Sequence, residues 1–180
     1  MSAISQLDGE QKVSAVPAVP ANPARAGSGS AAQVVVLRMR SSEYALPIGR
    51  VQEIVRVPEI TPLPEAPPGV EGLINLRGRV LPVVDLASRL GLGKVEQTRN
   101  ARVVIVKSSG EQVHEVGLLV DSVSKVLRLG VDDVEPTSEI AAGDSRSLIL
   151  GVAKVNDQLI LLLDLDGALN NQQIAETFTG

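Results

Sequence analysis

The sequence predicts an all-β protein made of two similar small barrels, and three of its features carry this prediction. First, 44% of the 180 residues are hydrophobic but only 1% are aromatic, so the core has to be built from Val, Leu, Ile and Ala. Such a core favours strands, because β-branched side chains are stiff at χ1 and pack well on a pleated sheet. Second, the apolar residues fall in short runs bounded by Gly, Pro and polar residues. Third, the second half of the chain repeats the plan of the first.

The two ends of the chain are expected to lie outside the barrels. Residues 1–32 are rich in Ala, Pro, Ser and Gly without helical or strand periodicity, which is typical of a disordered tail or linker. A docking motif is the alternative interpretation of this segment. Residues 171–180 are expected to form a C-terminal tail. The folded part, residues 33–170, is predicted to contain two intertwined barrels at approximately 33–100 and 101–170.

The first half begins with two predicted strands, residues 33–39 and 44–47, joined by a turn. From Ile48 to Val55 the apolar residues are spaced three and four apart, which predicts a short helical turn rather than a strand. Five prolines between residues 58 and 68 then predict an ordered loop or an irregular edge strand.

A hairpin and a short helix are predicted next. Residues 73–76 and 80–84 have the pattern of two strands, and the tight turn at Arg77-Gly78 lets the glycine adopt a positive φ. Asp85 is predicted to cap a short helix that runs to Leu90, with Gly91 as its stop.

An internal repeat links the two halves. Every apolar position of residues 48–57 is matched in residues 120–129, at an offset of 72, and the strand at 34–37 has a counterpart at 103–106. Downstream, at an offset of 79, Gly72 matches Gly151, Val80 matches Leu159, Asp85 matches Asp164 and Leu86 matches Leu165. One copy holds about five short strands, the size of one small barrel, so two packed or interleaved barrels are predicted.

Residues that the copies share are explained by the shared fold, so the positions at which they differ are better functional candidates. Glu53 and Arg77 occur only in the first copy, where the second copy has Lys125 and Asn156. If the two side chains meet, the guanidinium can grip the carboxylate with two hydrogen bonds. The pattern leaves open the alternative of two unrelated solvated charges. The shared Asp85 and its counterpart are interpreted as helix caps rather than as catalytic carboxylates.

Composition excludes several classes of function. The net charge of −4 argues against a nucleic-acid binder, which needs a basic face to displace counterions. The absence of cysteine excludes thiol catalysis, disulfides and Cys-containing zinc sites. His114, the one histidine, falls on the polar face of a predicted strand and is interpreted as solvated. With no phosphate-binding glycine loop or Ser-His-Asp arrangement, the sequence predicts no enzyme, no cofactor and no metal.

Two further features concern location and surface. The first ten residues lack the features of a secretory signal, and no apolar run approaches the roughly 18 residues of a spanning helix, so a cytoplasmic protein without membrane insertion is predicted. Residues 159–163 form a continuous apolar run, which indicates a strand buried on both faces or one that also serves a partner.

Residues 75–86, Asn-Leu-Arg-Gly-Arg-Val-Leu-Pro-Val-Val-Asp-Leu, resemble the signature of the CheW family. Three more stretches agree in the same order: residues 51–54, Gly72 and residues 117–123. The resemblance runs from about Gln33 to Leu169 and implies two five-stranded, Src-homology-3-like barrels with short helices.

The resemblance also implies a function without catalysis. The family bridges the cytoplasmic tip of methyl-accepting chemoreceptors to the regulatory domain of the histidine kinase CheA, in receptor arrays at the inner membrane. Barrel ends meet the kinase, and other CheW-like domains, in rings. The positions that match the family's receptor-binding groove are Val51, Glu53, Gly72, Arg77 and Val126. No residue is assigned to the kinase interface.

One departure and one alternative remain. The tail of some 30 residues is longer than the family's usual N-terminus and suggests a variant serving a second chemosensory or pilus-motility system. Neither a phosphotransfer domain nor a receiver is recognisable beside the module, so a stand-alone coupling protein is expected. The alternative is a small-ligand-binding or enzymatic double barrel with its site in the groove between the copies.

Overall fold

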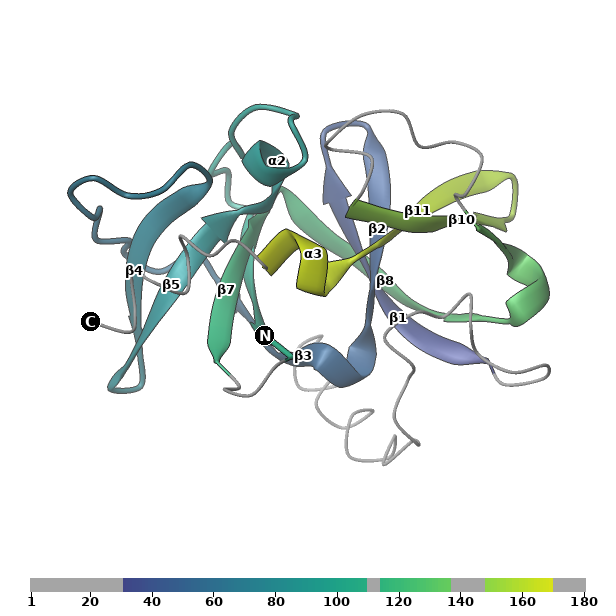
Figure 1. Ribbon diagram of the computed structural model, residues 1–180, viewed down its shortest axis with the longest axis horizontal. Coiled ribbons are helices and arrows are strands. Elements are labelled where there is room, and N and C mark those ends of the chain that lie inside the picture. The colour runs from purple at the N-terminus through teal and green to yellow at the C-terminus, as the bar shows by residue number, and fades with distance from the viewer. Residues whose placement is uncertain (1–30, 110–113, 137–147, 170–180) are drawn as a thin grey trace.

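The computed structural model describes residues 31–109, 114–136 and 148–169. Of the tails predicted at residues 1–32 and 171–180, residues 1–30 and 171–180 lie outside these ranges, whereas Ala32 is buried at the start of a strand. The described residues form strands with a few one-turn helices, which confirms the all-β fold (Figure 1).

The strands form two sheets that lie beside each other. The five-stranded sheet, here called barrel 1, contains in spatial order β3 (Val51–Arg56), β6 (Arg102–Lys107), β7 (Glu115–Val120), β5 (Arg79–Asp85) and β4 (Val70–Leu76). The six-stranded sheet, barrel 2, contains β8 (Ser122–Leu129), β1 (Ala32–Met39), β2 (Ser42–Pro47), β11 (Gln158–Leu163), β10 (Ile149–Val155) and β9 (Val134–Pro136). The first five strands of each list are equivalent pairs, so the repeat in the sequence is a repeat in space.

The chain crosses between the barrels twice. It leaves barrel 2 after β2, through the short helix η2 (Ile48–Arg50), and it leaves barrel 1 after β7 to begin β8. Each crossing is accompanied by one parallel strand pair, β5 with β7 and β11 with β2, whereas the other pairs are antiparallel. Residues 33–100 and residues 101–170 therefore each contribute strands to both barrels.

The hydrophobic core consists of two apolar clusters, and strands of barrel 2 lie between them. In β1, Val34 and Val36 face a small apolar cluster inside barrel 2, whereas Val35 and Leu37 face the larger cluster that continues through barrel 1. The predicted strand at 159–163 is β11 and is buried on both faces in the same way, although Leu159 at its start is 63% exposed. A strand that faces apolar surface on both sides needs a continuous apolar run, which explains the pattern in the sequence.

The prediction of a helical turn from Ile48 to Val55 was correct for its first residues only. Only η2 is helical, and the chain is extended as β3 from Val51 onward. The pairing of β3 with β6 shifts register between Val51 and Glu53. Such a bulge adds a residue to one strand, so Val51 and Ile54 both reach the core at a spacing of three, which imitates a helix.

The predicted turns and caps are confirmed. Arg77 and Gly78 have φ values of 53° and 85°, and the equivalent Asn156 and Asp157 have 49° and 63°, so both hairpins close through two residues in the left-handed region. This geometry matches the twist of the flanking strands.

The capping aspartate is also as predicted. Asp85 accepts from the Ser88 N–H at 3.0 Å and caps α2 (Leu86–Arg89), and its second oxygen accepts from the Val95 N–H at 2.9 Å. Asp164 accepts from the Gly167 N–H at 3.0 Å at the start of α3 (Leu165–Leu169). The shared aspartates are therefore structural.

Candidate functional site

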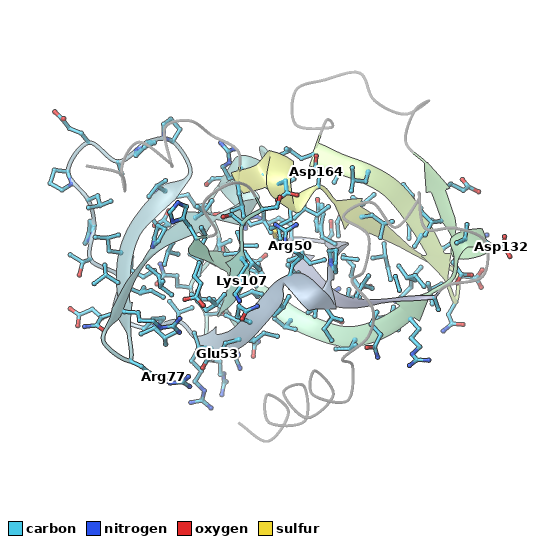
Figure 2. All side chains as sticks on the ribbon, turned by 60° about the horizontal axis from the view of Figure 1, so that its bottom comes forward. Arg50, Glu53, Arg77, Lys107, Asp132 and Asp164 are labelled. Carbon is cyan, nitrogen blue, oxygen red and sulfur yellow. The ribbon has the colours of Figure 1, made fainter. Side chains whose placement is uncertain are left out.

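Glu53 and Arg77, the charged residues found only in the first copy, meet in space. Arg77 Nη2 lies 2.6 Å from Glu53 Oε1 and Nη1 lies 3.1 Å from Oε2, so the contact is a two-pronged ion pair. Figure 2 shows both side chains at one end of barrel 1. The planar fork of arginine matches a carboxylate in this way, which fixes direction as well as distance. Of the two readings left open by the sequence, the structure selects the ion pair.

The two partners differ in exposure. The Arg77 side chain is 72% exposed, whereas that of Glu53 is 15% exposed. Arg77 sits at the tip of the β4–β5 hairpin, where Asn75 Oδ1 accepts from the Gly78 N–H at 3.0 Å and so stiffens the turn. The bulge in β3 sets the direction of Glu53. The covered carboxylate thus orients an arginine that is open to a partner.

A second ion pair on the same hairpin was not found from the sequence. Arg79 Nη1 donates to Glu115 on the neighbouring β7. The hydrogen bond and the charge of Glu115 raise the pKa of Arg79, and the nearby charge of Glu53 adds to this. The internal repeat could have pointed to Glu115, because β7 and β2 are equivalent strands and Glu115 occupies the position that Glu43 holds in barrel 2.

Val51 and Gly72 have supporting positions. Val51 is only 3% exposed and belongs to the main core beneath β3. Gly72 has a φ of 154°, and a Cβ there would stand 2.2 Å from the Thr61 carbonyl oxygen, because the proline-rich loop pairs with β4 through Thr61 and Leu73. Only glycine allows this approach.

Val126 lies apart from the other four candidates. It is on β8 in barrel 2, partly exposed, and packs against the main core. It is equivalent to Ile54 on β3, and both β8 and β3 are edge strands of their sheets. A surface that includes Val126 as well as Glu53 has to span the junction between the barrels.

The described residues contain neither a metal-ligand cluster nor a membrane-spanning helix. No group of three or more His, Cys, Asp or Glu side chains within residues 31–109, 114–136 and 148–169 could hold a metal ion. His114 is exposed just before β7, and its backbone pairs with Ser108. In the described part of the chain, no helix is long and apolar enough to cross a membrane.

The described residues thus form two equivalent β-barrels joined through one large apolar cluster, with ion pairs on the hairpin of one barrel. The model of the CheW-like domain matches residues 33–173, and the chain belongs to this family. Members of the family are non-enzymatic scaffold or adaptor proteins of bacterial chemosensory signalling, and this chain is one of them rather than an enzyme.

Individual relatives agree with this family assignment. The chain is 37% identical over 141 residues to the chemotaxis protein CheW of Rhizobium meliloti (strain 1021), covering 78% of this chain and 89% of that protein. It is 33% identical over 127 residues to CheW of Helicobacter pylori (strain ATCC 700392 / 26695), covering 71% and 74%. The crystal structure of the scaffolding protein TtCheW from Thermoanaerobacter tengcongensis matches with a TM-score of 0.70 and 33% identity, covering 80% of this chain and 96% of that one. These relatives give no support to the enzymatic alternative.

Proposed function

We propose that this protein couples methyl-accepting chemoreceptors to the histidine kinase CheA in cytoplasmic arrays at the inner membrane, and that the receptor binds at Glu53 and Arg77. The observation that carries the site is the difference between the barrels. Their five equivalent strands have the same order and their hairpins the same geometry, yet among the described residues barrel 1 has the two-pronged pair where barrel 2 has Lys125 and Asn156. Barrel 2 closes its hairpin with Asn156 in the place of Arg77, so the fold does not require the arginine.

The two members of the pair have different roles in this proposal. A guanidinium carries five N–H donors, and Glu53 occupies two of them, so Arg77 keeps donors for oxygen atoms of the receptor. Glu53 holds the fork in one orientation, which reduces the entropy lost when the receptor binds. Arg77 is the contact and Glu53 its support.

The remaining candidates support or extend this surface. Val51 holds β3 against the core, and Gly72 keeps the proline-rich loop against β4. Val126 would carry the receptor surface across the junction onto barrel 2. The regulatory domain of CheA and further CheW-like domains, arranged in rings, would bind elsewhere on the barrels, at residues that we do not assign.

A double-mutant cycle tests the site. The affinity of a receptor cytoplasmic fragment is measured by calorimetric titration for the wild type, Arg77→Ala, Glu53→Ala and the double variant. We expect Arg77→Ala to weaken binding about tenfold or more, and the double variant to lose less than the sum of the singles, because the pair acts as a unit. Lys94→Ala is the matched control, since it removes an exposed cation with a 3.7 Å carboxylate partner, Glu71.

Three outcomes are informative. Unchanged receptor affinity in folded Arg77→Ala protein would contradict the site. Strictly additive losses would show that Glu53 and Arg77 act separately. Pull-down of CheA should be unaffected in every variant, because the proposal places the kinase elsewhere.

A further inference from the structure

A third ion pair lies where the chain crosses from barrel 2 to barrel 1. Arg50, the last residue of η2, donates from Nη2 to Asp166 Oδ1 at 2.6 Å and from Nη1 to Asp166 Oδ2 at 3.2 Å. Its Nε and Nη2 also donate to the carbonyl oxygen of Lys107, at 2.9 Å and 2.7 Å. All three guanidinium nitrogens are therefore bonded, and Figure 2 shows Arg50 beside Lys107 near the middle of the molecule.

This arginine is more enclosed than the other paired cations in the described part of the chain. Its side chain is 19% exposed, whereas the paired Lys and Arg side chains elsewhere are 36% to 81% exposed. Asp166 is itself anchored: it lies on α3, whose Leu165, Ala168 and Leu169 are buried in the main core, and it also accepts from the Ser109 N–H at 3.3 Å. Figure 1 shows α3 between the two barrels.

The position of the contact on β6 shows what it holds. The ladder of β3 with β6 begins at Val51 and Val106. Lys107 is the next residue of β6, and its carbonyl is taken by the Arg50 side chain. Arg50 thus extends the ladder by one step and fixes the start of β3, three residues before Glu53.

The second crossing has no such contact. At the repeat offsets, Arg50 corresponds to Ser122 and Asp166 to Ala87, and neither of those residues can form an ion pair. The chain nevertheless enters β8 there as an ordered strand, and α2 carries Ala87 in the core. Both members of the pair are absent from the equivalent place, so the barrel fold does not require them.

We propose that Arg50 and Asp166 are positioning residues for receptor binding. They hold the first residues of β3, and with them Glu53, in the orientation that presents Arg77, and they do not touch the receptor. This inference rests on the proposed receptor site. It adds two residues from distant parts of the chain to the determinants of that site.

Variants that copy the second crossing test the inference: Asp166→Ala, Arg50→Ser and the double variant. We expect each to weaken the binding of a receptor cytoplasmic fragment about fivefold to tenfold, with the double variant little worse than the singles. Amide hydrogen exchange should accelerate in β3 (Val51–Arg56) but not in the equivalent β8 (Ser122–Leu129). Asp166→Glu, which keeps the carboxylate, should bind within about twofold of wild type.

If Asp166→Ala fails to fold, Arg50→Lys takes its place, because lysine keeps the positive charge but lacks the planar guanidinium fork. Arg50→Lys should also weaken receptor binding and accelerate amide exchange in β3. Unchanged receptor affinity in folded Asp166→Ala protein would overturn the inference, provided that Arg77→Ala is impaired. Lost affinity with unchanged β3 exchange would also overturn it, because Asp166 would then contact the receptor directly. If Arg77→Ala binds normally as well, the proposed receptor site itself is wrong.

Discussion

Barrel 1 and barrel 2 have the same strand order, the same hairpin turns and the same capping aspartates, but they distribute charge differently. In barrel 1 two paired cations lie on the hairpin: Arg77 reaches Glu53 on β3 and Arg79 reaches Glu115 on β7. In barrel 2 the paired cation among the described residues, Lys125, lies on the edge strand β8, 3.7 Å from Glu43.

The difference separates two kinds of residue. Turn geometry and caps are kept in both barrels because the backbone requires them, whereas the sign and position of surface charges can change at little cost to the fold. Substitutions at equivalent positions of the two barrels test this division.

Gly72→Ala should be the most damaging change. The added Cβ would meet the Thr61 carbonyl at 2.2 Å and force a residue at φ 154°, so we expect a loss of about 3 kcal/mol or more. The equivalent Gly151→Ala places its Cβ 2.9 Å from the Glu135 carbonyl oxygen without a positive φ, and it should cost less. Urea unfolding of both variants measures the difference, and a larger loss at Gly151 would break the comparison.

Asp85→Ala should cost about 2 kcal/mol or more, because it leaves the N–H groups of Ser88 and Val95 without their acceptor in a site that is 1% exposed. Asp164→Ala should cost about 1 kcal/mol, since its side chain accepts one described cap bond, from Gly167. Thermal melts of the two variants provide the test. Equal losses would mean that the bond to Val95 contributes nothing.

Arg77→Ala should lower stability by about 1 kcal/mol or less, because the arginine is 72% exposed and the pair is screened by solvent. The converse graft, Lys125→Glu with Asn156→Arg, should place an equivalent pair on barrel 2 with a change of about 0.5 kcal/mol or less. Chemical unfolding of both proteins measures these values. Global unfolding of Arg77→Ala would show that barrel 1 depends on this arginine structurally.

The smallest expected effect on stability is the loss of the Asp166 contribution at acidic pH. Hydrogen bonds from the Arg50 guanidinium hold the pKa of Asp166 below its usual value. A carboxylate whose folded pKa is depressed stabilises the fold fully above its unfolded value, near 3.8, and this contribution disappears as the pH falls through the lower folded pKa. Asp166→Asn should therefore be less stable than wild type at pH 6, and the two should converge as the pH falls below the depressed folded pKa of Asp166. A constant difference across this range would exclude an ionic contribution.

Local features were predictable from the sequence because each depends on residues close together in the chain. The Arg77-Gly78 turn needs a residue with free φ, and Asp85 caps the helix that begins one residue later. The aliphatic composition and the internal repeat determined that two sheets of strands would form. The receptor-site candidates came from a family signature and from differences between the copies, and their spatial relations did not follow from either.

Tertiary structure decided what depends on distance. The bulge at Val51 converted a helical spacing into a strand, because the register of β3 is set by β6, about 50 residues further along the chain. The meeting of Glu53 with Arg77 depends on a hairpin folding back over β3, and that of Arg50 with Asp166 joins residues 116 positions apart. The sequence alone determined that two similar barrels form, since strand patterns are local and the repeat appears on comparing the two halves of the chain. Which charges meet was decided by the packing of strands and helices that are distant in the chain, because pairing between remote side chains depends on topology rather than on spacing.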